Sequence, residues 1–202
     1  MSDKLYLSAQ EFLLDSFRLG MQVLASRFVP TFIVAIWRGG TPVGIAVQEC
    51  LHYYGVSTNH IAIRTSSYQG IDQRSATVRI HDMAYLIDTL CHDDRLLIVD
   101  DVFDTGQTIS RVLEEIRTRA RRNAPQMIRV AATYYKPSRN QTSRAPDYFV
   151  RETDKWLKFP HSLEGLSLAD IHTHRPALYD IVRKALELTQ GYRPPTHHSG
   201  PD

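Results

Sequence analysis

The chain has 202 residues, 43% of them hydrophobic and 23% charged, which is the composition of a globular protein rather than a disordered or coiled-coil one. Its 24 lysines and arginines against 22 aspartates and glutamates give a net charge of +2, which does not indicate a nucleic-acid partner. Two isolated cysteines, no signal-peptide core and no apolar run near the ~20 residues of a membrane span lead us to expect a cytoplasmic protein with no membrane partner.

The N-terminal third predicts a helix, a strand and a second helix. Ser8 and Glu11 have the spacing of a capping box, and the apolar residues that follow recur at helical intervals, so we expect a helix over residues 9–27. A continuous apolar run at 31–36 has the length of a buried strand, and a glycine turn then leads into a helix at about 42–54.

The same alternation continues through the middle of the chain. Residues 60–63, 96–99 and 128–134 are expected to be strands, and 106–121 an amphipathic helix with one apolar face. Buried strands that alternate with helices predict an α/β fold with a doubly wound, mainly parallel sheet.

Two stretches interrupt this pattern. Residues 65–82 are polar and are expected to form a long flexible loop, since such a loop in a compact domain is usually functional, for example as a lid. Residues 137–170 are rich in proline and aromatic residues and are expected to form a small hood subdomain. We expect one domain over residues 1–190 and a disordered tail over 191–202.

The segment at 96–108 carries the strongest chemical signal. A buried strand runs into Asp100 and Asp101, which offer oxygen acceptors for ribose hydroxyls and a divalent cation. A polar turn then begins a helix, whose free amides and dipole favour a phosphate group. A plain helix cap made by Asp104 or Thr105 is the alternative explanation, although three acids and two threonines within nine residues make it a poor one.

This segment closely resembles the signature of type I phosphoribosyltransferases, which bind phosphoribosyl pyrophosphate (PRPP). The signature is an apolar strand, two acids, two mostly apolar residues and Asp-Thr-Gly-x-Thr. The resemblance implies that Asp100 and Asp101 bind the ribose and Mg²⁺, and that Asp104 is a general base. The residues that it places at the 5′-phosphate are Asp104, Thr105, Gly106, Gln107 and Thr108.

Two further segments are similar to loops of the 6-oxopurine branch of this family. Arg38 and Gly39 fall in the counterpart of the pyrophosphate loop, where glycines let the backbone approach an anion. Ser67 and Tyr68 match the flexible catalytic loop, which closes over PRPP and excludes water. Three arginines either help to hold phosphates or are ordinary surface residues: Arg64, Arg74 and Arg79.

The base-binding residues are implied by the same resemblance. Lys136 matches a lysine that donates to the 6-oxygen of the purine, a preference that would reject adenine. Trp156 and Leu157 match the hood positions that stack on the base and read its edge through the backbone. Related hoods continue with tryptophan and an acid where His161 and Ser162 stand here, which bears on base preference.

The resemblance therefore implies a glycosyltransferase of purine salvage. It would convert PRPP and a 6-oxopurine, with hypoxanthine or guanine ahead of xanthine, into the nucleoside monophosphate and pyrophosphate, using Mg²⁺ and acting as a homodimer or homotetramer. The alternative is a regulator on the same fold that senses PRPP or nucleotide without turnover. The complete set of loop, lysine and aromatic positions favours the enzyme.

Overall fold

The structure is a computed structural model that describes residues 4–69, 76–81 and 83–188. Their contacts define two compact units, Met1–His161 and Ser162–Asp202. The first unit contains the predicted sheet and the signature segment, and the described part of the second contains two helices.

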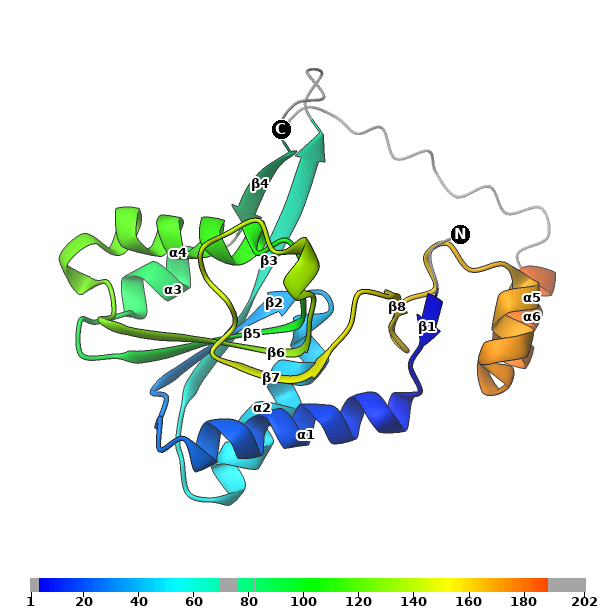
Figure 1. The fold of residues 1–202 in the computed structure, drawn as a ribbon, viewed down its shortest axis with the longest axis horizontal. Coiled ribbons are helices and arrows are strands. Elements are labelled where there is room, and N and C mark those ends of the chain that lie inside the picture. The colour runs from blue at the N-terminus through cyan, green and yellow to red at the C-terminus, as the bar shows by residue number, and fades with distance from the viewer. Residues whose placement is uncertain (1–3, 70–75, 82, 189–202) are drawn as a thin grey trace. The chain divides into compact units, whose positions relative to one another are not determined.

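A six-stranded sheet forms the centre of the first unit, in the order β4-β3-β2-β5-β6-β7 (Figure 1). Every neighbouring pair is parallel except β3 and β4. The mixed α/β architecture with a mainly parallel sheet confirms the predicted fold class. The strands are β2 (Phe32–Trp37), β3 (Asn59–Gln69), β4 (Ala76–His81), β5 (Arg95–Phe103), β6 (Met127–Tyr135) and β7 (Tyr148–Glu152).

Helices cover both faces of this sheet. The helices α1 (Ala9–Ala25) and α2 (Gly40–Tyr53) pack together on one face, and α3 (Ala84–Thr89) and α4 (Gln107–Ala120) lie on the other (Figure 1). Short 3₁₀ turns follow α4 and β6, at Arg121–Asn123 and Pro137–Arg139.

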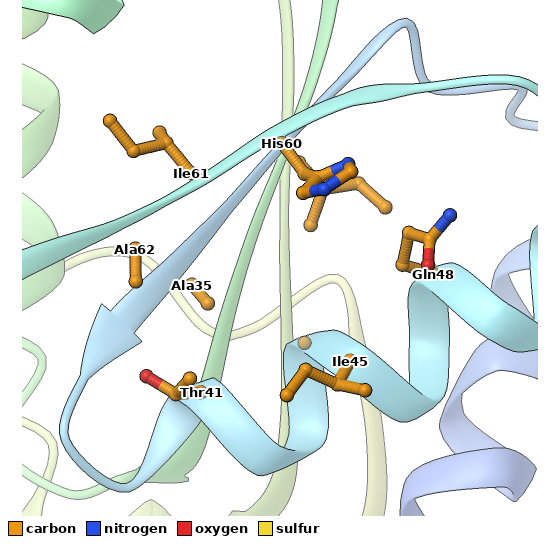
Figure 2. Close-up of a pocket in the computed structure, with 9 residues that line it drawn as sticks. Ala35, Thr41, Ile45, Gln48, His60, Ile61 and Ala62 are labelled. Atoms are coloured by element: carbon orange, nitrogen blue, oxygen red, sulfur yellow. The ribbon is translucent and has the colours of Figure 1, made fainter.

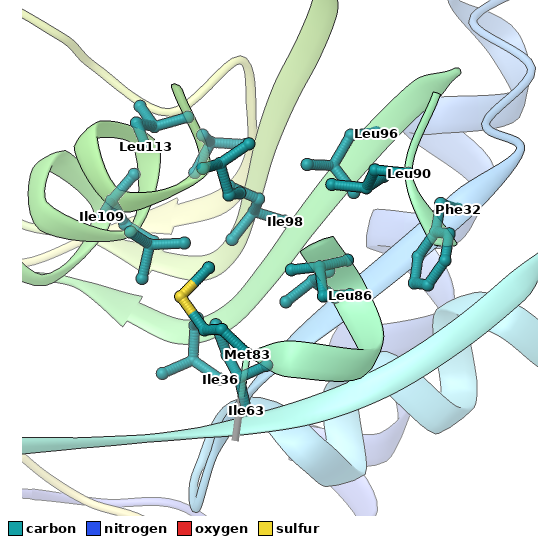
Figure 3. Packing of buried hydrophobic residues seen from close by; sticks show 14 of the residues in the cluster. Phe32, Ile36, Ile63, Met83, Leu86, Leu90, Leu96, Ile98, Ile109 and Leu113 are labelled. Carbon is teal, nitrogen blue, oxygen red and sulfur yellow. The ribbon is translucent and has the colours of Figure 1, made fainter. Parts of the chain in front are cut away.

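Alternate strand residues supply two separate cores. Phe32, Val34 and Ile36 of β2 join the core beneath α3 and α4, whereas Ile33 joins the core beneath α1 and α2. Figure 3 shows the first core, where Met83 and Leu86 pack near the strand residues. Because both of its faces are buried, β2 is apolar throughout, and each fully buried large side chain contributes about 1.5–3 kcal/mol.

The capping box at the start of α1 is formed as predicted. Ser8 Oγ accepts a hydrogen bond from the Glu11 amide at 3.1 Å, and the Glu11 carboxylate accepts one from the Ser8 amide at 3.4 Å. The helix ends at Ala25, two residues before the predicted end, because Ser26 Oγ donates to Val23 O and Arg27 adopts a positive φ of 62°.

Most of the expected flexible loop at 65–82 forms a β-hairpin arm, so the expectation of a segment without strands was wrong there, whereas its flexibility stays a prediction. Strand β3 continues to Gln69, and β4 pairs with it in antiparallel register from Ala76 to His81. Backbone hydrogen bonds between the two strands satisfy the polar main chain, which an apolar pattern in the sequence cannot reveal. Residues 70–75 lie outside the described part of the chain.

A small two-stranded parallel sheet carries part of the expected hood. Strand β1 (Lys4–Tyr6) pairs with β8 (Trp156–Lys158), so that Lys4 stands beside Trp156 and Leu5 beside Leu157. The second unit contains α5 (Leu168–His174) and α6 (Pro176–Leu188), and a Ser167–Asp170 capping box begins α5. No helix among the described residues has the length and apolarity to cross a membrane.

Candidate active site

The carboxyl end of β5 opens into a cavity of about 230 Å³. This is the edge of a parallel sheet at which ligands usually bind. Strand β5 extends to Phe103, so the acid pair lies within the strand and not after it. Most of the predicted sugar-phosphate residues line the cavity, namely Asp100, Asp101, Asp104, Thr105, Gly106 and Thr108.

The two adjacent acids are held in place by neighbouring polar groups. Asp100 Oδ1 accepts a hydrogen bond from the Asp101 amide at 2.9 Å, and Thr133 Oγ1 of β6 donates to the Asp101 carbonyl at 2.6 Å. Burial and the nearby Asp101 charge raise the pKa of Asp100 well above its usual range. A ligand that brings positive charge or hydroxyl donors to this edge would relieve the unfavourable burial of two like charges.

The glycine turn between β2 and α2 packs directly against these acids. A β-carbon on Gly39 would lie 1.9 Å from Asp101 Oδ2, and one on Gly40 would lie 2.6 Å from Val99 O. Only glycine permits this approach of the turn to the Asp101 carboxylate and to the β5 backbone. The amides at the start of α2 therefore lie beside the acidic end of β5.

The predicted phosphate turn leads directly into α4. Gly106 is the N-cap residue, with φ 78° and no side-chain cap hydrogen bond, so Asp104 does not cap the helix. Thr105 Oγ1 is 3.4 Å from the Gln107 amide, a long contact that leaves the first turn open to an anion. The Gln107 side chain donates to Gln141 Oε1 at 2.7 Å and does not line the cavity.

Asp104 belongs to a cluster with residues that follow β6 and with Trp156 of β8. Arg139 Nε lies 2.7 Å from Asp104 Oδ1, and Lys136 Nζ lies 3.8 Å from Asp104 Oδ2, beyond hydrogen-bond range. The Lys136 side chain is buried, and its ammonium lies 5.7 Å from the centre of the Trp156 ring. The fold thus brings together three predicted residues: Asp104, Lys136 and Trp156.

One oxygen of Asp104 is shielded from solvent without a hydrogen-bond donor. Although Arg139 Nε is close, no hydrogen bond to Asp104 Oδ1 is formed, so the two groups interact only through charge. Because Oδ1 is shielded and lies against Arg139, the Asp104 oxygen left to accept a hydrogen bond from a ligand is Oδ2, which faces Lys136.

The predicted pyrophosphate and flexible-loop residues lie near the ends of β2 and β3. Arg38 lines an open cavity of about 440 Å³ with Trp37, Arg64 and Thr65. Arg64 of β3 is the register partner of Trp37, the residue before Arg38. Arg38 and Arg64 therefore lie at the same cavity. The backbone at Ser67 and Tyr68 pairs with β4, whereas their side chains lie outside the described part of the chain.

Beyond β8, the chain returns to the acid pair at His161. His161 Nε2 lies 3.6 Å from Asp101 Oδ2, and the imidazole stacks on Phe159 at 5.4 Å between ring centres. Leu157 packs with the core beneath α1 and α2. Asp101 is thus approached from one side by Gly39 and from another by His161.

The residues at the acid pair fit a Mg²⁺ ion shared with a substrate. Mg²⁺ in such sites is usually held by one or two carboxylates together with substrate phosphates and water. Asp100 and Asp101 offer carboxylates next to two open helix N-termini that can hold phosphates. Among the described residues no three acid, histidine or cysteine side chains gather into a metal site.

Another pocket lies between α2 and the β2–β3 pair, with a volume of about 170 Å³ (Figure 2). Ile45, Ile61 and Ala62 give it a largely apolar lining, while His60 and Gln48 lie near each other at one end. None of the site residues predicted from the sequence lines this pocket.

Comparison with models of protein families shows which family the chain belongs to. Residues 6–169 match the model of the phosphoribosyl transferase domain. The chain belongs to this family. The match covers both the sheet and the hood, and it includes all of the predicted site residues.

Several solved structures are similar to this chain in fold. A purine phosphoribosyltransferase from Pyrococcus horikoshii is 28% identical, covers 82% of this chain and 97% of its own, and has a TM-score of 0.62. The Helicobacter pylori xanthine-guanine-hypoxanthine phosphoribosyltransferase shares the fold at 19% identity, with 91% and 98% coverage and a TM-score of 0.62. A Neisseria gonorrhoeae hypothetical protein with bound ppGpp shares it at 17% identity, with 88% and 98% coverage and a TM-score of 0.67. Comparison with curated proteins gives no match.

Three residues that contact the predicted site residues were not themselves predicted as site residues: Thr133, Arg139 and His161, the last noted only as a departure from related hoods. Thr133 is a β-branched residue within an apolar strand, and its hydroxyl carries no motif. Arg139 and His161 each follow a predicted base-binding segment by a few residues, which was the available signal. Their contacts depend on how the chain turns after β6 and β8.

Proposed function

We propose that this protein transfers the phosphoribosyl group of PRPP to a 6-oxopurine, yielding the nucleoside 5′-monophosphate and pyrophosphate. Hypoxanthine and guanine are the favoured bases, and xanthine is a further one. The observation that carries the proposal is the cluster of the Asp104 carboxylate, the buried Lys136 ammonium and the half-exposed Trp156 ring.

In this proposal PRPP occupies the edge formed by β5 and the two helix N-termini. Asp100 and Asp101 accept hydrogen bonds from the ribose hydroxyls. The open first turn of α4 holds the 5′-phosphate, and Arg38 with the Gly39 turn holds the pyrophosphate. Bound Mg²⁺ would neutralise charge on the departing pyrophosphate.

The purine stacks on the Trp156 ring, which is 47% exposed and so has a face available. Lys136 donates a hydrogen bond to the 6-oxygen, whereas an amino group at that position would present a second donor. A purine ring nitrogen bonds to C1 of the ribose as the bond from C1 to pyrophosphate breaks. The proton that the purine gives up passes from N7 to Asp104.

The β3–β4 arm completes the site in this proposal. Ser67 and Tyr68 lie in this arm, where closure over PRPP would exclude water from the positively charged sugar. Exclusion of water favours transfer to the base over hydrolysis.

A panel of bases tests the function. Hypoxanthine, guanine, xanthine and adenine are each incubated with the protein, PRPP and Mg²⁺, and nucleotide formation is followed by chromatography. We expect turnover of hypoxanthine or guanine and little with adenine. Adenine turnover faster than that of every 6-oxopurine would refute the base assignment. PRPP binding without turnover of any base would favour the regulator instead.

A further inference from the structure

Arg139 is the charged residue closest to Asp104. Neither the signature nor the hood pattern gives Arg139 a role. Its Nε lies 2.7 Å from Asp104 Oδ1, and its side chain is 45% exposed. Asp104 also faces the buried Lys136 at 3.8 Å. One carboxylate thus lies between two cations, in close contact with the more exposed one.

The backbone holds Arg139 at this place. The Lys136 amide donates to Phe103 O at 3.0 Å, and the Gln141 amide donates to Thr105 O at 3.0 Å. The Arg139 amide itself donates to Lys136 O at 3.1 Å and closes the turn. The segment around Arg139 is therefore attached on both sides to the loop that carries Asp104.

The contact of Arg139 with Asp104 bears on how Asp104 and Lys136 can both stay available to a purine. A buried ammonium and a carboxylate a few ångströms apart attract each other strongly, because the local dielectric is low. If Asp104 and Lys136 formed a direct hydrogen-bonded pair, neither group would be available to a purine. The 3.8 Å separation shows that the pair is not closed, and Arg139 supplies the competing charge.

We infer that Arg139 is a positioning residue that holds the Asp104 carboxylate away from Lys136, so that the carboxylate can accept a proton and the ammonium can bind the 6-oxygen. This inference rests on the proposed function for its kinetic consequences. Its structural consequence, the open Asp104–Lys136 pair, can be tested without any activity.

The variants are Arg139→Gln, which removes the charge, and Arg139→Lys, which keeps it. Lysine suits this site because the contact is a single charge pair and not a two-pronged hydrogen bond. The matched control is Arg111→Gln, since Arg111 is 41% exposed and pairs with Glu114 and Glu115 on α4, without lining the cavity.

In the kinetic test, Arg139→Gln is expected to lower kcat by roughly 10- to 100-fold and to raise KM for the base, as is common when the partner of a functional group is lost. KM for PRPP and the melting temperature should stay at wild-type values. Arg139→Lys should recover most of the activity, and Arg111→Gln should behave as wild type. Wild-type kinetics in Arg139→Gln, or equal losses in Arg139→Gln and Arg139→Lys, would overturn the inference.

In the structural test, a crystal structure of Arg139→Gln should show Lys136 Nζ and Asp104 Oδ2 moving from 3.8 Å to a direct hydrogen bond of about 2.8 Å. A pair that stays open would overturn the inference even if activity fell. A wild-type protein that turns over no base would refute the proposed function, while the Lys136–Asp104 distance would still decide the role of Arg139.

Discussion

Gly39, in the turn before α2, and Asp101, near the end of β5, lie so close that a β-carbon on Gly39 would be 1.9 Å from Asp101 Oδ2. The turn after β2 and the acidic end of β5 therefore form a single surface. In the proposed function this contact joins the pyrophosphate loop to the ribose-binding acids.

Substitution of Gly39 by alanine should therefore damage PRPP binding. The added methyl group must displace the Asp101 carboxylate or the turn, and we expect KM for PRPP to rise at least tenfold, with a stability loss of about 1–3 kcal/mol from overpacking. Steady-state kinetics and urea unfolding measure the two effects. Gly20→Ala is the control, because a β-carbon on Gly20 would also be too close to a neighbour, at 2.8 Å from Cys50 Cβ, but it lies outside the candidate site. An equal PRPP effect in both variants would contradict the prediction.

Asp104→Asn should separate catalysis from folding. The structure gives Asp104 no helix-capping hydrogen bond, and its side chain is 32% exposed, so the melting temperature should change little. Loss of a general base should lower kcat by roughly 10² to 10⁴. Single-turnover kinetics and thermal unfolding of this variant check both parts, and a stable variant with wild-type kcat would rule out the catalytic role.

Trp156→Ala should weaken binding of the base and leave PRPP binding intact. Loss of a stacking surface is expected to cost about 1–3 kcal/mol, seen as a higher KM for the purine. Trp37→Ala is the comparison variant. This tryptophan is also exposed, at 53%, but it lines the cavity that contains Arg38 and not the proposed base site. A base KM unchanged by Trp156→Ala would show that this residue serves the fold alone.

Asp147 should make the stability of the first unit dependent on pH. Burial raises the pKa of Asp147, but hydrogen bonds from Arg129, the Val130 amide and Arg144 outweigh burial and lower the pKa overall. Its contribution to stability is therefore complete above an unfolded-state pKa of about 3.9 and is lost as the pH falls through the lower folded-state pKa.

The destabilisation caused by Asp147→Asn should accordingly be largest near neutral pH and should shrink below about pH 4. Urea unfolding at several pH values measures it. Asp93→Asn is the control, since the Asp93 side chain is 98% exposed. A destabilisation by Asp147→Asn that is independent of pH would contradict the prediction.

Exposed apolar residues favour the expected homodimer or homotetramer. One face of α1 exposes four large side chains, and Tyr53 at the end of α2 is 84% exposed. Contiguous apolar surface of this kind usually marks an interface. Sedimentation should give two or four times the chain mass of 23.1 kDa, and a monomer alone at working concentration would refute it. The four exposed apolar side chains of α1 are those of Leu13, Leu14, Phe17 and Met21.

The sequence by itself determined the parallel α/β fold and the position of the segment proposed to bind the sugar phosphate. Strands that are buried on both faces must be continuously apolar, so β2, β5 and β6 are visible as short runs such as 96–99. The acids and the glycine turn of 100–108 are contiguous, so their chemistry can be read without knowledge of the fold. The Ser8–Glu11 capping box is equally local.

Only the tertiary structure decided which charges meet. Arg139 contacts Asp104 across 35 positions and His161 approaches Asp101 across 60, because the turns after β6 and β8 return the chain to the end of β5. The β3–β4 arm was missed for a related reason: its strands are held by backbone hydrogen bonds to each other, and such pairing leaves no periodic trace in a polar sequence. Side-chain patterns record what is buried, whereas partners distant along the chain are set by how the strands are connected.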